Sequence, residues 1–176
     1  MANTVLALDK VFRIRSPDDL LRKLGREIFW LDRSLSERRD GELIEEACFH
    51  AVNGAVTAWQ LCDWSAHILN AKSGWAAASA GTGSQLASLA DLQAYARKRP
   101  EMRACQQIAT AYKHLRMYEV AFNAAIQTTE SASTDSAFPG WELTVIIEGV
   151  QLDARVVLAG AFDFWLHHLE WLRVVE

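Results

Sequence analysis

The sequence predicts a mostly α-helical protein: a single-domain helical bundle of residues 1–176 with a small antiparallel β-hairpin before its last helix. Apolar residues recur every three or four positions over long stretches, which is typical of amphipathic helices. The run WELTVIIEG is rich in β-branched residues and partly alternates, as in a strand. A chain of 176 residues, 51% of them hydrophobic, is long enough for one core and short for two.

The first helix is predicted over residues 17–36 and the second, central helix over residues 42–70. Ser16 is a good N-cap, Pro17 suits the first helical position, and Asp18 and Asp19 suit the positive end of the helix dipole. The loop ERRDGE separates this helix from the central one, which is apolar on almost every side. Both helices are therefore expected to contribute to the core.

Residues 72–90 are rich in glycine, serine and alanine, and predict a flexible connection. The alternative is a mobile lid or a phosphate-binding loop around GTGS, but no Gly-Lys-Ser/Thr follows and no strand precedes it. A short helix is predicted over residues 88–99, where Ser88 and Asp91 form a capping box. Pro100 then begins a fourth helix, predicted over residues 100–118.

A β-insertion is predicted over residues 124–149. The threonine-rich stretch 124–131 is expected to pair with residues 141–148, and Gly149 ends the second strand. The last helix is expected over residues 153–175, and no internal repeat is present.

Composition predicts a cytoplasmic protein. The N-terminus lacks the pattern of a signal peptide, and no apolar run approaches the roughly 20 residues of a membrane span. The cysteines Cys48, Cys62 and Cys105 lie in apolar helical surroundings, which indicates buried thiols rather than disulfides. No cofactor or metal ion is predicted. Seven tryptophans indicate a large core, a partner interface or both, so we expect a homo-oligomer or a protein partner.

Polar residues recur every seventh position along the central helix, at Glu46, Asn53, Gln60 and His67. On a helix they form a line between two apolar flanks, bordered by Thr57. The fourth helix carries a matching polar face. If the two faces meet, they form a polar seam, made of Asn53, Thr57, Gln60, Gln107 and Thr110.

This seam has two interpretations. It can be a buried hydrogen-bonded network that fixes helix register, or the lining of a catalytic or ligand-binding site. In a site, Asp63 would orient His67 as a base, because the two are four residues apart on one helix. Lys113 would bind an anion and His114 would act as an acid. Asp63, His67, Lys113 and His114 are therefore the candidate catalytic residues.

The basic cluster Arg97, Lys98, Arg99 and Arg103 falls at a corner between two predicted helices. It is either a solvated turn or a phosphate-contact patch. No aromatic residues are interleaved with it, so the sequence does not favour a nucleic acid as partner. The adjacent pair His167 and His168 diverges on a helix, which predicts one buried and one solvated side chain.

The motifs SPDDLLRKLGRE, VTAWQLCDW and IATAYKH resemble, in that order, a group of small uncharacterised bacterial helical proteins. The resemblance covers residues 16–114 and implies that Thr57, Asp63, Trp64, Lys113 and His114 are signature positions. The chain is more distantly similar to HEPN-type helical bundles, which include RNA-cleaving toxins. Those use an arginine followed by a histidine after four to six residues, whereas here Arg103 and His114 are eleven apart.

The function expected from the sequence is an oligomeric interaction or regulatory module in the cytosol. The alternative is a small enzyme or ligand-binding protein, RNA-directed if it is HEPN-like. Its site would lie between the helices predicted over residues 42–70 and 100–118.

Overall fold

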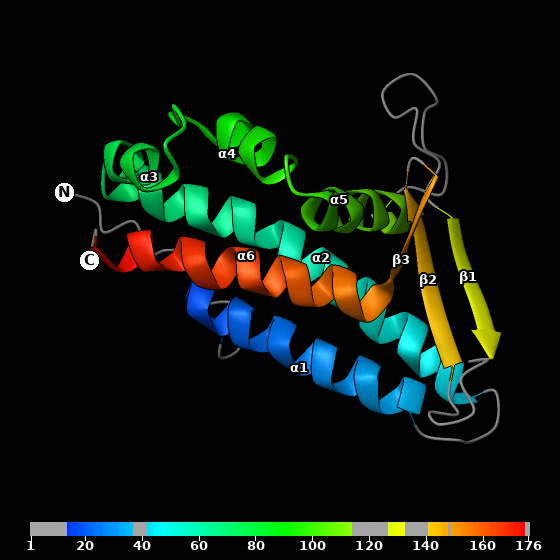
Figure 1. Ribbon diagram of the computed structural model, residues 1–176. Coiled ribbons are helices and arrows are strands. Elements are labelled where there is room, and N and C mark those ends of the chain that lie inside the picture. The colour runs from blue at the N-terminus through cyan, green and yellow to red at the C-terminus, as the bar shows by residue number, and fades with distance from the viewer. Residues whose placement is uncertain (1–13, 37–41, 114–126, 133–140, 148, 175–176) are drawn as a thin grey trace.

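Three helices run side by side along the length of the molecule (Figure 1). The computed structural model describes residues 14–36, 42–113, 127–132, 141–147 and 149–174. The three helices are α1 (Pro17–Ser36), α2 (Glu42–Ala71) and α6 (Ala154–Val174), and each contacts the other two. The fold is therefore a mostly helical bundle, as the apolar periodicity predicts.

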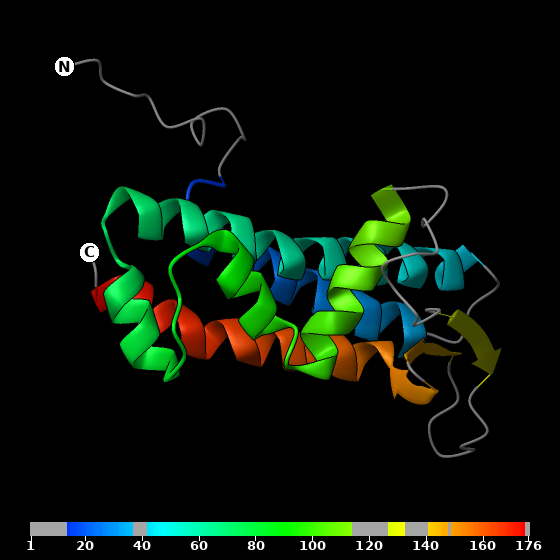
Figure 2. The same ribbon diagram turned by 90° about the horizontal axis from the view of Figure 1, so that it is seen from above.

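The remaining helices form a second layer across α2 and α6, on the side opposite α1 (Figure 2). They are α3 (Trp75–Thr82), α4 (Leu89–Ala96) and α5 (Pro100–Lys113). The helix predicted to start at Pro100 is confirmed as far as Lys113, and its expected continuation over 114–118 lies outside the described residues.

A small antiparallel sheet precedes α6, which confirms the predicted hairpin. Its strands, in the order β1-β2-β3, are β1 (Gln127–Ala132), β2 (Trp141–Ile147) and β3 (Val150–Asp153). The third strand was not predicted, because two strands were expected from the sequence, the second ending at Gly149. Gly149 has φ +79°, a conformation suited to glycine, and the chain turns there to pair Val150 with Ile147.

Two helices begin with the caps that the sequence predicts. The backbone N–H of Asp19 donates to Ser16 Oγ at 3.2 Å, and Asp19 Oδ2 accepts from the backbone N–H of Arg15 at 2.9 Å. The bond from Arg15 lowers the pKa of the Asp19 carboxyl, and the Ser16 hydroxyl, which donates to Asp19 Oδ2 at 3.0 Å, acts in the same direction. Ser88 caps α4 in the same way, with Asp91 completing the box.

Part of the predicted flexible connection over residues 72–90 is helical, because α3 occupies eight of its residues. Trp75 anchors this helix by donating from Nε1 to Asn70 Oδ1 at 2.8 Å, and Ala78 is fully buried. The helix ends at Gly83, whose φ of +61° provides a left-handed C-cap. Alanines inside the glycine- and serine-rich stretch supply the helix propensity.

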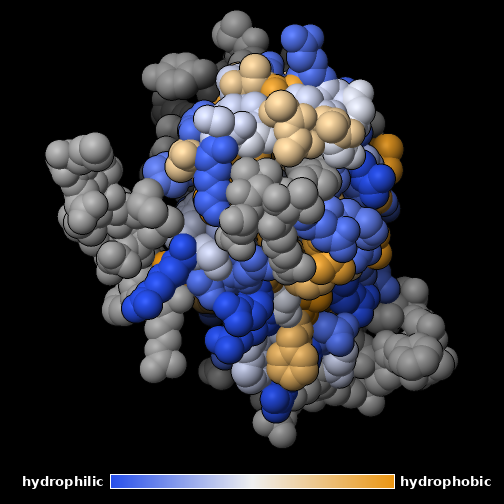
Figure 3. Space-filling model, turned by 90° about the vertical axis from the view of Figure 1, so that its left-hand side faces the viewer, coloured by the Kyte–Doolittle hydropathy of each residue, from blue (hydrophilic) through white to orange (hydrophobic). Residues whose placement is uncertain are grey.

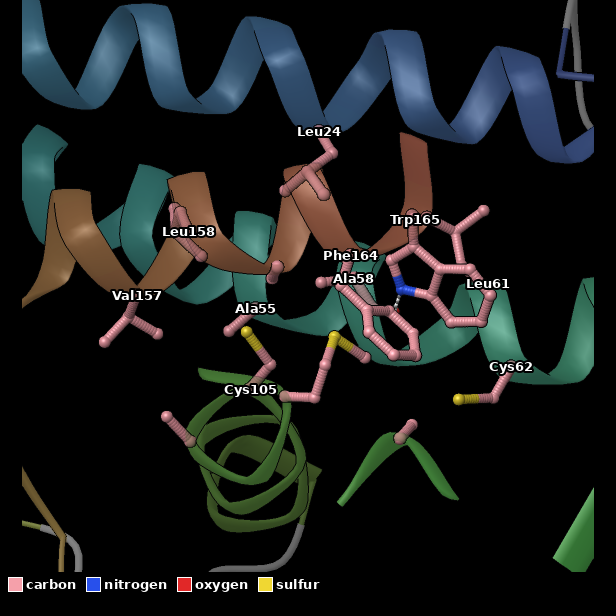
Figure 4. Packing of buried hydrophobic residues seen from close by; sticks show 14 of the residues in the cluster. Leu24, Ala55, Ala58, Leu61, Cys62, Cys105, Val157, Leu158, Phe164 and Trp165 are labelled. Carbon is pink, nitrogen blue, oxygen red and sulfur yellow. Dashed lines mark hydrogen bonds between the residues drawn. The ribbon is translucent and has the colours of Figure 1, made fainter. Parts of the chain in front are cut away.

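The core lies where α1, α2, α5 and α6 converge (Figure 4). Trp165 is 1% exposed and donates from Nε1 to the backbone oxygen of Ala58 at 2.8 Å. Leu24 and Leu61 are fully buried nearby. Cys105 is a free, buried thiol whose pKa is raised to about 12 by burial, so it remains protonated.

Hydrophilic and hydrophobic side chains are interspersed over the end of the bundle at which α3 lies (Figure 3). Among the described residues, no helix is both long enough and apolar enough to cross a membrane.

Candidate functional site

A cavity of about 600 Å³ lies between α6 and the corner that joins α4 to α5. This volume is in the range of small-molecule sites in proteins. Its lining combines aromatic rings with charged groups and comes from two parts of the chain: Tyr95, Lys98, Arg99, Asp163, Phe164, His167 and His168.

Local structure explains why these side chains meet. The backbone N–H groups of Lys98 and Arg99 bond to the carbonyls of the last residues of α4, and Pro100 starts α5 immediately afterwards. Both cations therefore lie on a tight corner and are exposed to solvent. On α6, the four lining residues are spaced i, i+1, i+4 and i+5, which places them along one side of the helix.

Aromatic rings form one wall of the cavity. The rings of Phe164 and His168 are stacked, with centroids 3.9 Å apart and planes inclined by 22°. The Tyr95 ring lies 5.4 Å from His168 and 6.1 Å from Phe164. Phe164 is buried, whereas Tyr95 and His168 are half-buried. The wall therefore offers ring faces and edges to a ligand that enters the cavity.

The imidazole of His168 is held on both sides by hydrogen bonds. Its Nδ1 donates to the backbone oxygen of Phe164, so in the neutral ring Nε2 accepts from the hydroxyl of Tyr95 at 3.1 Å. Burial lowers the pKa of His168 to about 4, and the positive charges of His167 and Arg99 act in the same direction. His168 is therefore neutral near pH 7, and it orients the Tyr95 hydroxyl rather than donating a proton.

Positive charge gathers at the mouth of the cavity. Lys98 Nζ lies 5.5 Å from the centroid of the Tyr95 ring, and Arg99 Nε lies 3.6 Å from Glu101 Oε2. Asp163 contributes one negative charge, and its backbone oxygen accepts from His167 Nδ1 at 2.8 Å. The lining therefore holds two cations, Lys98 and Arg99, against one carboxylate, an arrangement that can bind an anion.

The candidate residues predicted from the sequence do not line this cavity, and only some of them lie close to one another. Gln60, Asp63 and Thr110 line a separate cavity of about 470 Å³ between α2 and α5. This is the place where the sequence predicted a site. Asp63 is the only charged group among the described residues that line it. His67 is exposed and does not line this cavity.

The predicted polar seam does not run along the full length of α2 and α5. Asn53 is exposed, whereas Gln107 is buried, and Thr110 donates to the backbone oxygen of Gln106 on its own helix at 2.8 Å. The amide oxygens of Gln106 and Gln107 accept no hydrogen bond from the described residues. The side chain of Lys113 and the whole of His114 lie outside the described residues.

Thr57 is buried, and its hydroxyl donates to the backbone oxygen of Asn53 at 2.7 Å while its side-chain partner is on α1. Lys23 Nζ donates to Thr57 Oγ1 at 2.6 Å and lies 3.2 Å from Glu27 Oε1. The other oxygen of Glu27 is 2.8 Å from His50 Nδ1. Glu27 and His50 thus form a carboxylate–imidazole pair that ties α1 to α2. A pair of the same kind was predicted between Asp63 and His67, and that pairing stays a prediction.

Sequence reasoning missed the aromatic wall beside the basic corner. The sequence places no aromatic platform among Arg97, Lys98 and Arg99, but α6 supplies Phe164 and His168 from almost 70 residues away. One signal was available: the adjacent histidines were expected to diverge, with one side chain buried and one solvated. His167 is exposed, whereas His168 is half-buried rather than buried.

Comparison of the chain with protein-family models, curated proteins and solved structures found no match. Among the described residues, no group of three or more histidine, cysteine, aspartate or glutamate side chains is placed to hold a metal ion.

Proposed function

We propose that this protein binds a small molecule that carries an anionic group on a planar or apolar body. The binding site is the cavity between α6 and the α4–α5 corner. The observation that carries the proposal is the position of two exposed cations, Lys98 and Arg99, directly beside the stacked rings of Phe164 and His168.

The cations supply attraction for a phosphate or carboxylate group. Lys98 offers three N–H donors, and Arg99 offers a planar fork that matches an oxyanion. Burial is the main cause of the lowered pKa of His168, and the charges of His167 and Arg99 add to it. An anion at this position would be stabilised by the same field.

The aromatic wall supplies the contact for the rest of the ligand. A planar ring can stack against the Tyr95 or His168 ring, and the Tyr95 hydroxyl has an acceptor lone pair free for a ligand donor while its proton is held by His168. Asp163 disfavours a ligand with several acidic groups but accepts a hydrogen bond from a donor group. We therefore expect a ligand of one acidic group with a ring and a donor.

Phenyl phosphate is a direct probe, because it combines a ring with a single phosphate. Titration calorimetry should give a Kd of about 0.1–1 mM, a typical strength for so small a ligand. Inorganic phosphate and phenol each retain only half of the contacts, and each should bind at least about tenfold more weakly.

Replacing both Lys98 and Arg99 by alanine should weaken phenyl phosphate about fivefold to thirtyfold, which corresponds to about 1–2 kcal/mol for two exposed charge contacts. Lys72→Ala is the matched control, because Lys72 is an exposed cation that does not line the cavity. Equal binding by the double variant and the wild type, or no binding of the probe at about 10 mM, would overturn the proposal.

A further inference from the structure

An exposed aromatic surface lies on the other side of the molecule, over α1 and α2. Phe29 is 60% exposed, Trp30 43% and Phe49 57%. Large aromatic side chains are seldom left in water, and a group of them on neighbouring helices is a mark of an interaction site.

The aromatic residues are ordered by contacts with their neighbours. The rings of Phe29 and Trp30 meet edge to face at 5.3 Å, and Trp30 is stacked over His50 of α2 at 6.4 Å. The Arg33 guanidinium carbon lies over the Trp30 ring, 5.2 Å from its centroid. The pair Glu27 and His50 beneath Trp30 fixes this side of α1 to α2. The surface is thus preorganised, which lowers the entropic cost of binding.

The two helices carry opposite charges around their exposed phenylalanines. On α1, Arg26 and Arg33 are three residues before and four residues after Phe29, and both are exposed. The exposed Asp32 lies three residues after Phe29, but its charge is offset within the chain by Arg155, 3.8 Å away. On α2, Glu45 and Glu46 are four and three residues before Phe49, and both are exposed. One helix therefore presents an aromatic group among cations, and its neighbour presents one among anions.

A surface with this charge pattern is complementary to itself. A two-fold axis between two copies would place α1 of each copy on α2 of the other, so that cations face anions twice. We propose that the outward faces of α1 and α2 form a two-fold interface with a second copy of this chain. The ligand cavity lies on the opposite layer, lined by α6 and the α4–α5 corner, and stays accessible in such a dimer.

The test uses two charge-reversed variants and their mixture. The first carries Arg26→Glu and Arg33→Glu, and the second carries Glu45→Arg and Glu46→Arg. Sedimentation at about 100 µM should show a dimer for the wild type, and each variant alone should dimerise at least about 100-fold more weakly, because like charges then meet on both sides of the axis. The equimolar mixture should restore a heterodimer, since one chain's reversed face meets the other chain's reversed face and the second pair of faces is unchanged.

The control variant carries Lys72→Glu and Glu170→Lys. Both residues are exposed, and neither lies on α1 or on the part of α2 near Phe49, so this variant should dimerise like the wild type. Circular dichroism of each variant shows that it is folded, and the recovery of dimer in the mixture is itself evidence of two folded chains. A monomeric wild type, two variants that remain dimeric, or a mixture that stays monomeric would each overturn the proposal.

Discussion

Replacing Gly54 by alanine probes a close contact between α2 and α6. A methyl group at this position would lie 2.5 Å from Leu158 Cδ1 and 3.2 Å from its Cδ2. Carbon atoms pack best at about 3.5–4.0 Å, so Leu158 would have to move by about 1 Å. Leu158 is 1% exposed and surrounded by the core, which leaves little room for that movement.

The expected cost is the difference between two effects. Overpacking a filled core costs about 1–3 kcal/mol, and alanine gains about 1 kcal/mol over glycine in a helix. Gly54→Ala should therefore lower the free energy of unfolding by up to about 2 kcal/mol. Gly81→Ala is the control, since Gly81 is exposed within α3 and should gain up to about 1 kcal/mol.

Urea denaturation of both variants measures the two values. If Gly54→Ala is stabilised as much as Gly81→Ala, the packing of Leu158 against α2 is wrong. A crystal structure of Gly54→Ala with an unmoved Leu158 side chain would contradict the same reasoning.

Three further predictions concern the core and the two polar sites. Leu61→Ala should lower the free energy of unfolding by about 2–5 kcal/mol in urea, because Leu61 is fully buried; a loss under about 0.5 kcal/mol would refute its position. Glu27→Ala should lower the free energy of unfolding by about 1–3 kcal/mol, because Lys23 and His50 lose the carboxylate that they share. An unchanged melting temperature would contradict that network. The pKa of His168 is about 4 in the folded protein, below its ordinary value of 6.5. As the pH drops, the unfolded chain therefore binds a proton at this histidine before the folded protein does. The free energy of unfolding should fall between about pH 6.5 and about pH 4. That loss, about 1–2 kcal/mol after allowance for partial exposure, should be absent in His168→Asn when melts are compared across this range.

The helices were predictable from the sequence because local signals mark them. Ser16 and Ser88 are followed three residues later by aspartate, and the caps form as expected. The prediction of a flexible connection over 72–90 failed in part, because the helix α3 depends on a tertiary contact. Composition shows glycine and serine there, but it does not show that Trp75 would bond to Asn70 and that Ala78 would be buried.

The candidate site was harder to predict than the fold. A polar residue every seventh position on α2 shows that one side of the helix is polar, but not which neighbour that side meets. Thr57 faces α1 and Asn53 faces solvent, although both belong to the predicted seam. The cavity beside Lys98 joins a helix corner to α6 across a long sequence separation, and a single sequence carries no information on such a pairing.

The most direct test of the proposed function is a proton NMR titration of the full chain with phenyl phosphate. Binding in the cavity should move the ring signals of Tyr95, Phe164 and His168, and leave those of Trp30 and Phe49 unchanged. A bound phosphate should also raise the pKa of His168 from about 4 by one unit or more, since a nearby negative charge favours the protonated imidazole. Shifts confined to other residues, or the same His168 titration curve with and without saturating probe, would contradict the account.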